Sequence, residues 1–328
     1  MWHICLTMVG THSRDDLTFG SISNAAQANS TKSFGLQHLN GYDNKGRNQH
    51  ERKRKDMTTD TATQGQLSEA AAKELLRQHA TGEPFSALGG PLALASTEAA
   101  YHVQDAYVAL LLRQRKTTLA GYKIALTTPA MREMVGFHDS VSGRLFSDQL
   151  HQADQAIAGA AYGRLIIEFE IAFRMARDLP ATDTPWTGAS ILEHVACAYP
   201  ALEIADDRRA DYATLKASIL TLVADNAWNQ GLVLGPACTC GSLQALADIQ
   251  GIARIDGQEV GRGSGRDVLG NPADALAWLA NSLADRRLTL RAGDLVTTGS
   301  LVKSQFPVAG QRVEFLLPSF GSVELAIT

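Results

Sequence analysis

The sequence predicts an α+β protein, on three observations. Apolar residues recur at helical spacing over residues 68–79 and 96–115. Beyond residue 118, short apolar runs are broken by Gly, Pro and Asp, which is typical of strands joined by loops. The chain has 328 residues, of which 45% are hydrophobic, so it can bury a substantial core without disulfides or metal staples.

Charge and hydropathy argue against several classes of protein. The 30 Lys and Arg residues are outnumbered by 34 Asp and Glu residues, which argues against a phosphate-binding surface for nucleic acid. No apolar run reaches the roughly 18 residues of a membrane-spanning helix. The 4 cysteines are too few and too scattered for a disulfide framework. We therefore expect a cytoplasmic protein with no nucleic-acid or membrane partner.

Residues 1–65 are predicted to be a disordered or spurious N-terminal extension. They are rich in Ser, Asn, Gln, Thr and Gly, lack apolar periodicity and include the charged run 51–56. That run fits a solvated linker better than a nuclear or nucleic-acid patch. Met57 opens a segment that reads like a normal protein start. Residues 66–328 are then one domain, helical over about 66–118 and β-rich over about 119–328.

The first helix is predicted over residues 68–79, an Ala- and Leu-rich stretch that is ended by Gly82 and Pro84. The second is predicted to begin after Ser96, which suits an N-cap, and to run to about Arg115.

The most informative segment is the predicted strand 165–174. Its alternation places Glu168 and Glu170 on one face and apolar side chains on the other. A helix is then predicted over 190–198, closed by Pro200. The apolar run 201–205 follows, and Glu203 is the one acid that interrupts it.

The C-terminal third is predicted to contain one helix among strands. A hairpin is expected to turn at Asp256–Gly257. The glycine segment 261–265 is read as a tight loop that lines the pocket, because it lacks the context of a dinucleotide site. A helix begins with Asn271 as N-cap and continues toward Leu283, and residues 293–327 are rich in strands.

Two carboxylates within an apolar strand need a partner, because a buried ionised acid is costly unless it is paired or bound to a metal. With Glu203, the pair Glu168 and Glu170 would form the oxygen-rich shell that Mg²⁺ or Mn²⁺ prefers. The alternative is that the glutamates face solvent, or that they pair with Arg164, Arg174 or Arg208.

Several motifs, each common alone, occur in a specific order. The E-x-E pair is followed by Arg-Asp-Leu-Pro at 177–180, Pro-Ala-Leu-Glu at 200–203 and Ala-Asp-Asn-Ala at 224–227. Gly-Tyr-Lys at 121–123, Leu-Gly-Asn-Pro at 269–272 and Thr-Gly at 298–299 extend the pattern. In this order they resemble the hydratase/decarboxylase branch of the fumarylacetoacetate hydrolase superfamily. The resemblance covers roughly residues 66–328.

The resemblance implies a catalytic domain with a mixed β-roll or sandwich and N-terminal helices packed outside. It implies that Glu168, Glu170 and Glu203 hold Mg²⁺ or Mn²⁺, and that Lys123 is an active-site lysine. The substrate would be a small 2-oxo acid or its dienol, chelated through the 2-oxygen and the carboxylate. A bound dication would stabilise the enolate that forms on that substrate.

The remaining candidates have less specific roles. Asp225 is expected to be catalytic, although local turn capping would explain it equally well. Substrate contacts are expected from Thr298, Gly299, Trp228 and His138. By resemblance only, we also expect a homo-oligomer, or a complex with a paired hydratase or decarboxylase.

Two residues depart from the family pattern. Hydratases of this branch usually carry an Asp at the position of Val141, and a small serine at the position of Trp228. The resemblance implies hydration of a 2-hydroxydienoate or 2-oxo-4-enoate in aromatic catabolism. The apolar Val141 resembles the decarboxylases more, so decarboxylation of a 4-oxalocrotonate-type diacid is the alternative. A non-catalytic partner subunit, or C–C hydrolysis aided by His138, also remains open.

Overall fold

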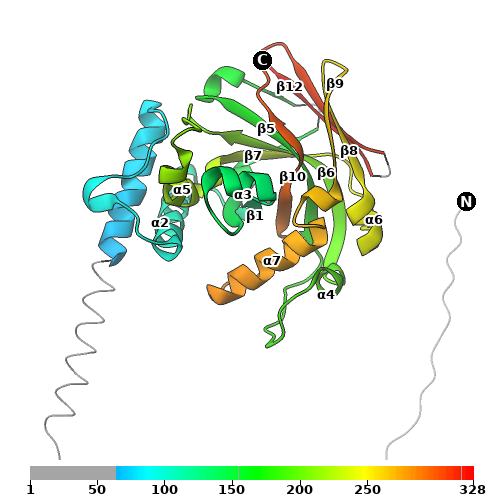
Figure 1. The fold of residues 1–328 in the computed structure, drawn as a ribbon, viewed down its shortest axis with the longest axis horizontal. Helices are drawn as coiled ribbons and strands as arrows, with labels where there is room; N and C mark the ends of the chain where they lie inside the picture. The colour runs from blue at the N-terminus through cyan, green and yellow to red at the C-terminus, as the bar shows by residue number, and fades with distance from the viewer. Residues whose placement is uncertain (1–63, 154, 319) are drawn as a thin grey trace, which may run out of the picture. The chain divides into compact units, whose positions relative to one another are not determined.

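Two mixed β-sheets and a layer of N-terminal helices make up the part of the chain that the structure describes (Figure 1). The structure is a computed structural model that describes residues 64–153, 155–318 and 320–328. The predicted N-terminal extension, residues 1–65, lies outside these ranges apart from its last two residues, and it stays a prediction.

The larger sheet has seven strands and carries the candidate site. Its strands lie in the order β2 (Val141–Phe146), β1 (Leu119–Ala125), β10 (Leu295–Gln305), β5 (Leu165–Met175), β6 (Val195–Asp206), β7 (Asn229–Leu234) and β3 (Leu150–Gln152). β1 and β10 are parallel, as are β3 and β7, and the other neighbours are antiparallel. The strand nearest the C-terminus in this sheet, β10, therefore lies between β1 and β5.

The smaller sheet has five strands. They lie in the order β4 (Ala156–Ile157), β12 (Gly321–Ile327), β11 (Arg312–Leu317), β8 (Gln250–Ile255) and β9 (Gln258–Ser264). Phe169 of β5 and Phe315 of β11 pack with ring centroids 5.6 Å apart, which joins the two sheets through one apolar core. β8 and β9 form the hairpin predicted at Asp256–Gly257.

Helices cover the sheets from several sides. The α-helices are residues 64–81, α2 (Thr97–Arg115), α3 (Pro129–Val135), α4 (Gly188–Leu192), α5 (Leu215–Ala224), α6 (Leu243–Asp248) and α7 (Pro272–Asp285). The 3₁₀ turns are η1 (Gly90–Leu92), η2 (Ser147–Gln149), η3 (Gly159–Ala161), η4 (Asn226–Trp228) and η5 (Gly265–Asp267). Ser96 caps α2 by accepting from the amide of Ala99, and Asn271 caps α7, both as predicted.

The N-terminal helices form a core of their own against one face of the larger sheet. Helix 64–81, α2 and α5 lie together at the left of Figure 1 and enclose Leu75, Tyr107 and Leu222. Ile166 of β5 and Ala205 of β6 supply the sheet side of this core. The predicted class, mixed sheets with N-terminal helices packed outside, is therefore confirmed.

Two local predictions were wrong. The helix predicted over 190–198 is the short α4 followed by β6, because Val195 and Ala198 pair with β5. That strand pairing outweighs the helical propensity of the alanines. The glycine segment 261–265 is mostly strand β9 and not a loop. A Cβ on Gly263 would lie 1.7 Å from the carbonyl oxygen of Leu301, so glycine lets β9 pass close to β10.

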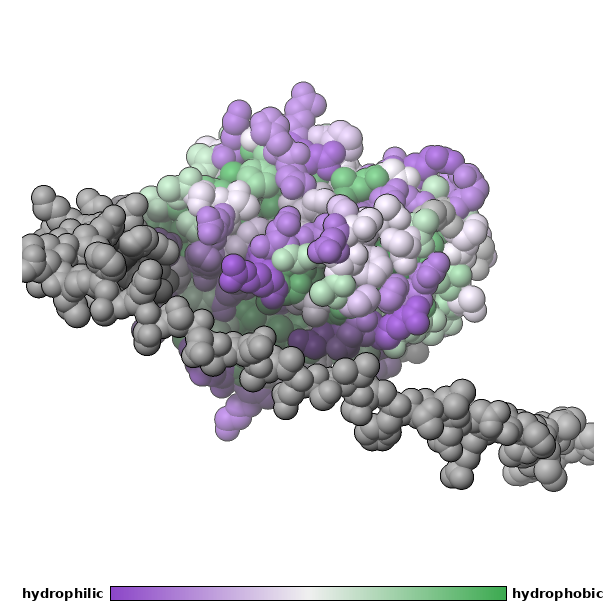
Figure 2. Space-filling view, turned by 90° about the horizontal axis from the view of Figure 1, so that it is seen from below, coloured by the Kyte–Doolittle hydropathy of each residue, from purple (hydrophilic) through white to green (hydrophobic). Residues whose placement is uncertain are grey.

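Across the described ranges, no helix is both long and apolar enough to cross a membrane. The face drawn in Figure 2 mixes hydrophilic and hydrophobic side chains over the described part of the chain.

Candidate metal centre

Four neighbouring strands bring the predicted charged residues together. Glu168 of β5 lies directly opposite Glu203 of β6, and Glu170 lies opposite Ser300 of β10. Lys123 of β1 lies opposite Thr297 of β10. Residues far apart in the sequence therefore share one sheet face, because β10 joins β1 to β5.

Glu168, Glu170 and Glu203 each offer one carboxylate oxygen, and these three oxygens all lie within 4.8 Å of one another. Glu170 and Glu203 are fully buried, whereas the Glu168 side chain is 23% exposed. Of the three acids, only Glu168 reaches solvent. Three oxygen donors at this spacing match the ligands that Mg²⁺ and Mn²⁺ prefer.

Each carboxylate is held by a donor from a neighbouring strand. The Gly299 amide donates to Glu170 Oε2 at 2.8 Å, and Ser304 Oγ donates to Glu168 Oε1 at 3.0 Å. Glu203 accepts from Thr297 Oγ1 at 3.2 Å and from Asn229 Nδ2 at 3.1 Å. These bonds fix the orientation of the acids before any ligand arrives.

One carboxylate oxygen in the cluster has no donor. Glu170 Oε1 is buried and makes no hydrogen bond within the described structure. Burial raises the pKa of Glu170 well above its usual value, and repulsion by Glu203 and Glu168 adds to this, against the attraction of Lys123 and the Gly299 amide. Burial likewise raises the pKa of Glu203. A buried, unpartnered acceptor among three acids is the environment that a cation would relieve.

Lys123 supplies the positive charge in this cluster. Its Nζ lies 2.9 Å from Glu203 Oε1 and 4.0 Å from Glu168 Oε2, and it donates to the carbonyl of Ala227 at 3.3 Å. Burial alone would lower the pKa of Lys123, but Glu203, Glu168 and Glu170 outweigh it and raise that pKa above the ordinary value. The lysine is thus held as an ammonium.

The arginines that could have neutralised the glutamates bind elsewhere. Arg164 pairs with Asp207, Arg174 donates to Tyr199, and Arg208 donates to Asp225 at 2.7 Å. The structure therefore disagrees with the alternative in which arginines pair with the acids of the cluster.

Asp225 lies in a separate buried network. It contacts His79 Nε2 at 2.6 Å and Arg208 Nη2 at 2.7 Å. Burial would raise the pKa of Asp225, but His79 and Arg208 outweigh it and hold that pKa below its usual value. None of the hydrogen bonds that we describe joins Asp225 to the three glutamates, so its expected catalytic role stays a prediction.

The four expected substrate contacts occupy different places. Gly299 borders the cluster through its amide, whereas the Thr298 hydroxyl donates to the Ile171 carbonyl at 2.9 Å. Trp228 is buried edge-on against Phe85, with ring centroids 5.0 Å apart. His138 is exposed in the loop between α3 and β2. Their roles in substrate binding stay predictions.

Sequence reasoning missed three residues that contact the acids: Thr297, Ser304 and Asn229. Thr297 lies opposite Lys123 of β1 and just before an irregularity in β10, so strand register brings it to the acids, and local alternation does not predict that register. Asn229 contacts Glu203 after a sharp turn of the backbone. The three residues before it, Asn226, Ala227 and Trp228, are left-handed, with φ of 53°, 48° and 62°. No sequence pattern that we considered predicts that path.

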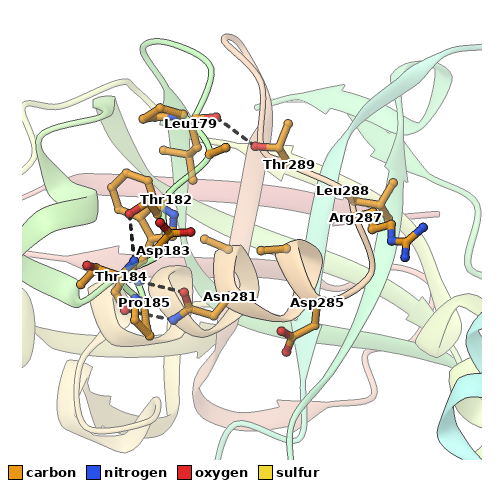
Figure 3. Close-up of a pocket in the computed structure, with 15 residues that line it drawn as sticks. Leu179, Thr182, Asp183, Thr184, Pro185, Asn281, Asp285, Arg287, Leu288 and Thr289 are labelled. Carbon is orange, nitrogen blue, oxygen red and sulfur yellow. Dashed lines mark hydrogen bonds between the residues drawn. The ribbon is translucent and has the colours of Figure 1, made fainter. Parts of the chain in front are cut away.

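A separate cavity of about 680 Å³ lies between the segment 179–186 and α7 (Figure 3). On one side of the cavity, the Asn281 side chain accepts from the Trp186 amide at 2.8 Å and donates to the Trp186 carbonyl at 3.0 Å. On another side, Thr289 donates to the Leu179 carbonyl at 3.2 Å. The glutamates of the cluster do not line this cavity, so it is not part of the candidate centre.

The chain belongs to the fumarylacetoacetate hydrolase family. Residues 136–328 match the family described as "Fumarylacetoacetate (FAA) hydrolase C-terminal". This confirms the resemblance that the order of the motifs indicated.

Among the relatives of this chain are hydratases, and a decarboxylase is among the similar solved structures. "2-keto-4-pentenoate hydratase 2" of Dechloromonas aromatica (strain RCB) is 33% identical over 78% of this chain and 95% of its own length. "2-hydroxyhexa-2,4-dienoate hydratase" of Comamonas testosteroni is 31% identical over 69% of this chain and 86% of its own length. Among solved structures, 4-oxalocrotonate decarboxylase from Pseudomonas putida G7, complexed with magnesium and adipate, gives a TM-score of 0.72 at 22% identity. It covers 80% of this chain and 98% of its own, and at that identity it shows the shared fold.

Proposed function

We propose that this chain is a divalent-metal-dependent lyase that hydrates a 2-hydroxydienoate or 2-oxo-4-enoate, as part of aromatic catabolism. The observation that carries the proposal is the convergence of Glu168, Glu170 and Glu203 beside the buried Lys123. The hydratases at about 30% identity support the choice of reaction and substrate class.

The metal would be Mg²⁺ or Mn²⁺, held by the three glutamates. When all three carboxylates are ionised, they and one ammonium leave two negative charges, which a divalent cation balances. Glu170 Oε1, which has no donor among the described residues, is free to act as a ligand. Such a cation, when bound, supplies Lewis-acid polarisation of the 2-oxo group.

The chain's own residues would orient the substrate and handle the proton. Hydration places a proton on one carbon of a double bond and a hydroxyl group on its neighbour, so an acid must stand close to the reacting carbons. Lys123 is kept as an ammonium within the cluster, and we assign it to the substrate carboxylate or to that proton. The partly exposed Glu168 marks the side from which substrate and water would enter.

The first experiment offers the purified chain 2-hydroxypenta-2,4-dienoate with added Mg²⁺ or Mn²⁺. We expect the ultraviolet band of the dienoate to disappear without release of CO₂. Replacing Glu168→Gln should remove Mn²⁺ binding and turnover together, because the amide is a weaker ligand. Retention of both would refute the assigned centre, and absence of turnover on every 2-oxo acid would refute the reaction.

Decarboxylation of a 4-oxalocrotonate-type diacid is the second candidate. Val141 is fully buried at the start of β2 and packs in the helical core, at the position where hydratases of this branch usually carry an acid. CO₂ release from the diacid, faster than dienoate hydration, would favour this candidate. Tight Mn²⁺ binding without any turnover would instead indicate a non-catalytic partner subunit.

The assembly and the location are also proposals. We propose a cytoplasmic homo-oligomer, or a complex with a paired hydratase or decarboxylase. The exposed side chains of Phe306 and Val308, 47% and 63% accessible, offer apolar surface for such a contact. Light scattering on the purified protein should give a mass of at least two chains, and the mass of a single chain would contradict the homo-oligomer.

A further inference from the structure

One short segment, residues 225–229, contacts both Lys123 and Glu203. The carbonyl of Ala227 accepts from Lys123 Nζ at 3.3 Å. Asn229 Nδ2 donates at 3.1 Å to Glu203 Oε1, the same oxygen that lies 2.9 Å from Lys123 Nζ. Any shift of this segment would therefore move the ammonium and the carboxylate together.

The segment holds an unfavourable backbone conformation. Asn226, Ala227 and Trp228 are all left-handed, with φ of 53°, 48° and 62°, a conformation that residues with a Cβ rarely adopt. Three such residues in a row persist only where the surroundings hold them in place. The anchors of the segment therefore decide where Ala227 and Asn229 point.

The anchors come from three directions. The Asn226 side chain makes two hydrogen bonds to the backbone of Arg144 on β2. Its Oδ1 accepts from the Arg144 amide at 2.6 Å, and its Nδ2 donates to the Arg144 carbonyl at 2.9 Å. Arg208 donates to Asp225 Oδ2 at 2.7 Å from the end of β6. His79, on helix 64–81, contacts Asp225 Oδ1 at 2.6 Å.

His79 is the anchor that faces solvent. Its side chain is 21% exposed, whereas Asp225 is fully buried. The ring stacks on Tyr107 of α2 with centroids 5.8 Å apart. His79, Asp225 and Asn229 all line a cavity of about 500 Å³ beneath the N-terminal helices, so a small molecule from solvent can reach the imidazole.

We propose that His79 is a positioning residue for Lys123 and Glu203, acting through Asp225 and the left-handed segment 226–228. The N-terminal helix thereby takes part in ordering the candidate centre, without touching it. This inference rests on the proposed function for its kinetic consequence, but the structural coupling stands on the contacts above.

The first test compares His79→Leu with His79→Gln. Leucine removes the contact with Asp225 at similar size, whereas the glutamine amide can donate from nearly the same position as Nε2. We expect kcat of the leucine variant to fall by about tenfold to a hundredfold, the range that a displacement of about 1 Å produces. The glutamine variant should keep most of the wild-type kcat. Equal kcat for the leucine variant and the wild type would overturn the proposal.

Chemical rescue makes the test more specific. His79→Ala leaves a gap that opens to the 500 Å³ cavity, so added imidazole should restore part of the lost kcat. The Mn²⁺ dissociation constant should change by a smaller factor than kcat in each variant, because only Glu203 of the three proposed ligands contacts the segment. Failure of imidazole and of glutamine to restore activity would contradict positioning through Asp225.

A matched control separates positioning from loosening of the helix. Leu75→Val weakens the packing of the same helix in its buried core but leaves His79 in place. Hydrogen exchange measured by mass spectrometry should become faster over residues 225–229 in His79→Leu and stay unchanged there in Leu75→Val. Equal acceleration in both variants would overturn the proposal.

Hydrogen exchange also distinguishes the two possible failures. If the wild-type chain turns over no 2-oxo acid, the proposed function fails, yet exchange over residues 225–229 still reports whether His79 holds the segment. If the wild type is active and His79→Leu changes neither exchange nor kcat, the positioning role fails alone.

Discussion

At the scale of single residues, the most informative side chain is Lys123. It is almost completely buried, yet it is charged and surrounded by three acids. A lysine in that position serves chemistry better than stability, because an apolar side chain would pack at lower desolvation cost.

We therefore expect Lys123→Met to lower kcat by at least about a hundredfold, the contribution of a positioned proton donor. Mn²⁺ should bind more tightly, because the ammonium 2.9 Å from Glu203 no longer repels it. Isothermal titration with Mn²⁺ and the dienoate assay measure the two effects. Lys303→Met, an exposed lysine of β10, is the control and should change neither. Unchanged turnover in Lys123→Met would contradict the assignment.

The sequence predicted that the charged residues of the candidate centre lie together, and it missed the polar residues that orient them. Glu168, Glu170 and Glu203 stood out because acids interrupt apolar runs, and Lys123 was placed by resemblance. Thr297 and Asn229 look like ordinary polar residues of strands in the sequence. Their importance comes from strand register and from a left-handed segment, which are tertiary features.

At the scale of elements, β10 shapes the centre through an irregularity. The pairing of β10 with β5 shifts between Thr297 and Ser300, and Gly299 lies at that shift with φ of 101°. The shift turns the Gly299 amide toward Glu170 Oε2, at 2.8 Å. A bulge beside a functional site that redirects one group is a recurrent device in sheets.

Gly299→Ala should destabilise the protein and weaken Mn²⁺ binding. The new Cβ would lie 2.1 Å from Thr127 Oγ1, in a backbone conformation that alanine disfavours. We expect a loss of roughly 2–4 kcal/mol in the free energy of unfolding, from left-handed strain and overpacking. Urea titration measures it.

Gly310→Ala is the matched control. Gly310 has φ of 91°, but a Cβ there meets nothing within 4 Å. The free energy of unfolding of Gly310→Ala should fall only by the cost of the left-handed conformation, about 1–2 kcal/mol, and the affinity for Mn²⁺ should not change. Similar losses for both variants would contradict the close approach at Gly299.

The buried network around Asp225 predicts a pH-dependent effect. Asp225→Asn leaves Arg208 buried without its counter-charge, so unfolding should become about 3–5 kcal/mol easier at pH 7. The pKa of Asp225 is lowered in the folded chain, so its contribution is complete above the unfolded value of about 4. That contribution is lost as pH falls through the still lower folded pKa.

Urea unfolding of wild type and Asp225→Asn between pH 7 and pH 3 tests this sign. The difference in free energy should shrink as the pH falls below about 4, where Asp225 of the unfolded chain becomes protonated. Asp183→Asn, which changes an exposed acid, should show no difference at any pH. A difference that does not shrink between pH 4 and pH 3 would contradict the assigned ion pairs.

Element boundaries also show where sequence reasoning ends. α2 and α7 were predicted from their caps and begin where expected, because capping is local chemistry. The helix expected over 190–198 was wrong because β5 pairs with residues 195–206. Strand pairing depends on distant residues, so alanine-rich stretches beside a strand are poorly predicted from local pattern.

At the scale of the whole molecule, the apolar clusters that we describe use residues from Ala71 onward. We expect a variant without residues 1–56, beginning at Met57, to keep the melting temperature and the kcat of the full chain. Thermal unfolding and the dienoate assay measure both. A fall in melting temperature of several degrees would contradict the prediction that residues 1–65 are a disordered or spurious extension.

The strand order of the larger sheet has a consequence for how the protein is made. β10 fills the place between β1 and β5, and it is synthesised after every other strand of that sheet. Until it enters, Lys123 and the acid pair have no common surface, and Glu170 lacks the Gly299 amide. A product cut short before Leu295 would therefore lack the assembled candidate centre as well as the last strand of the sheet.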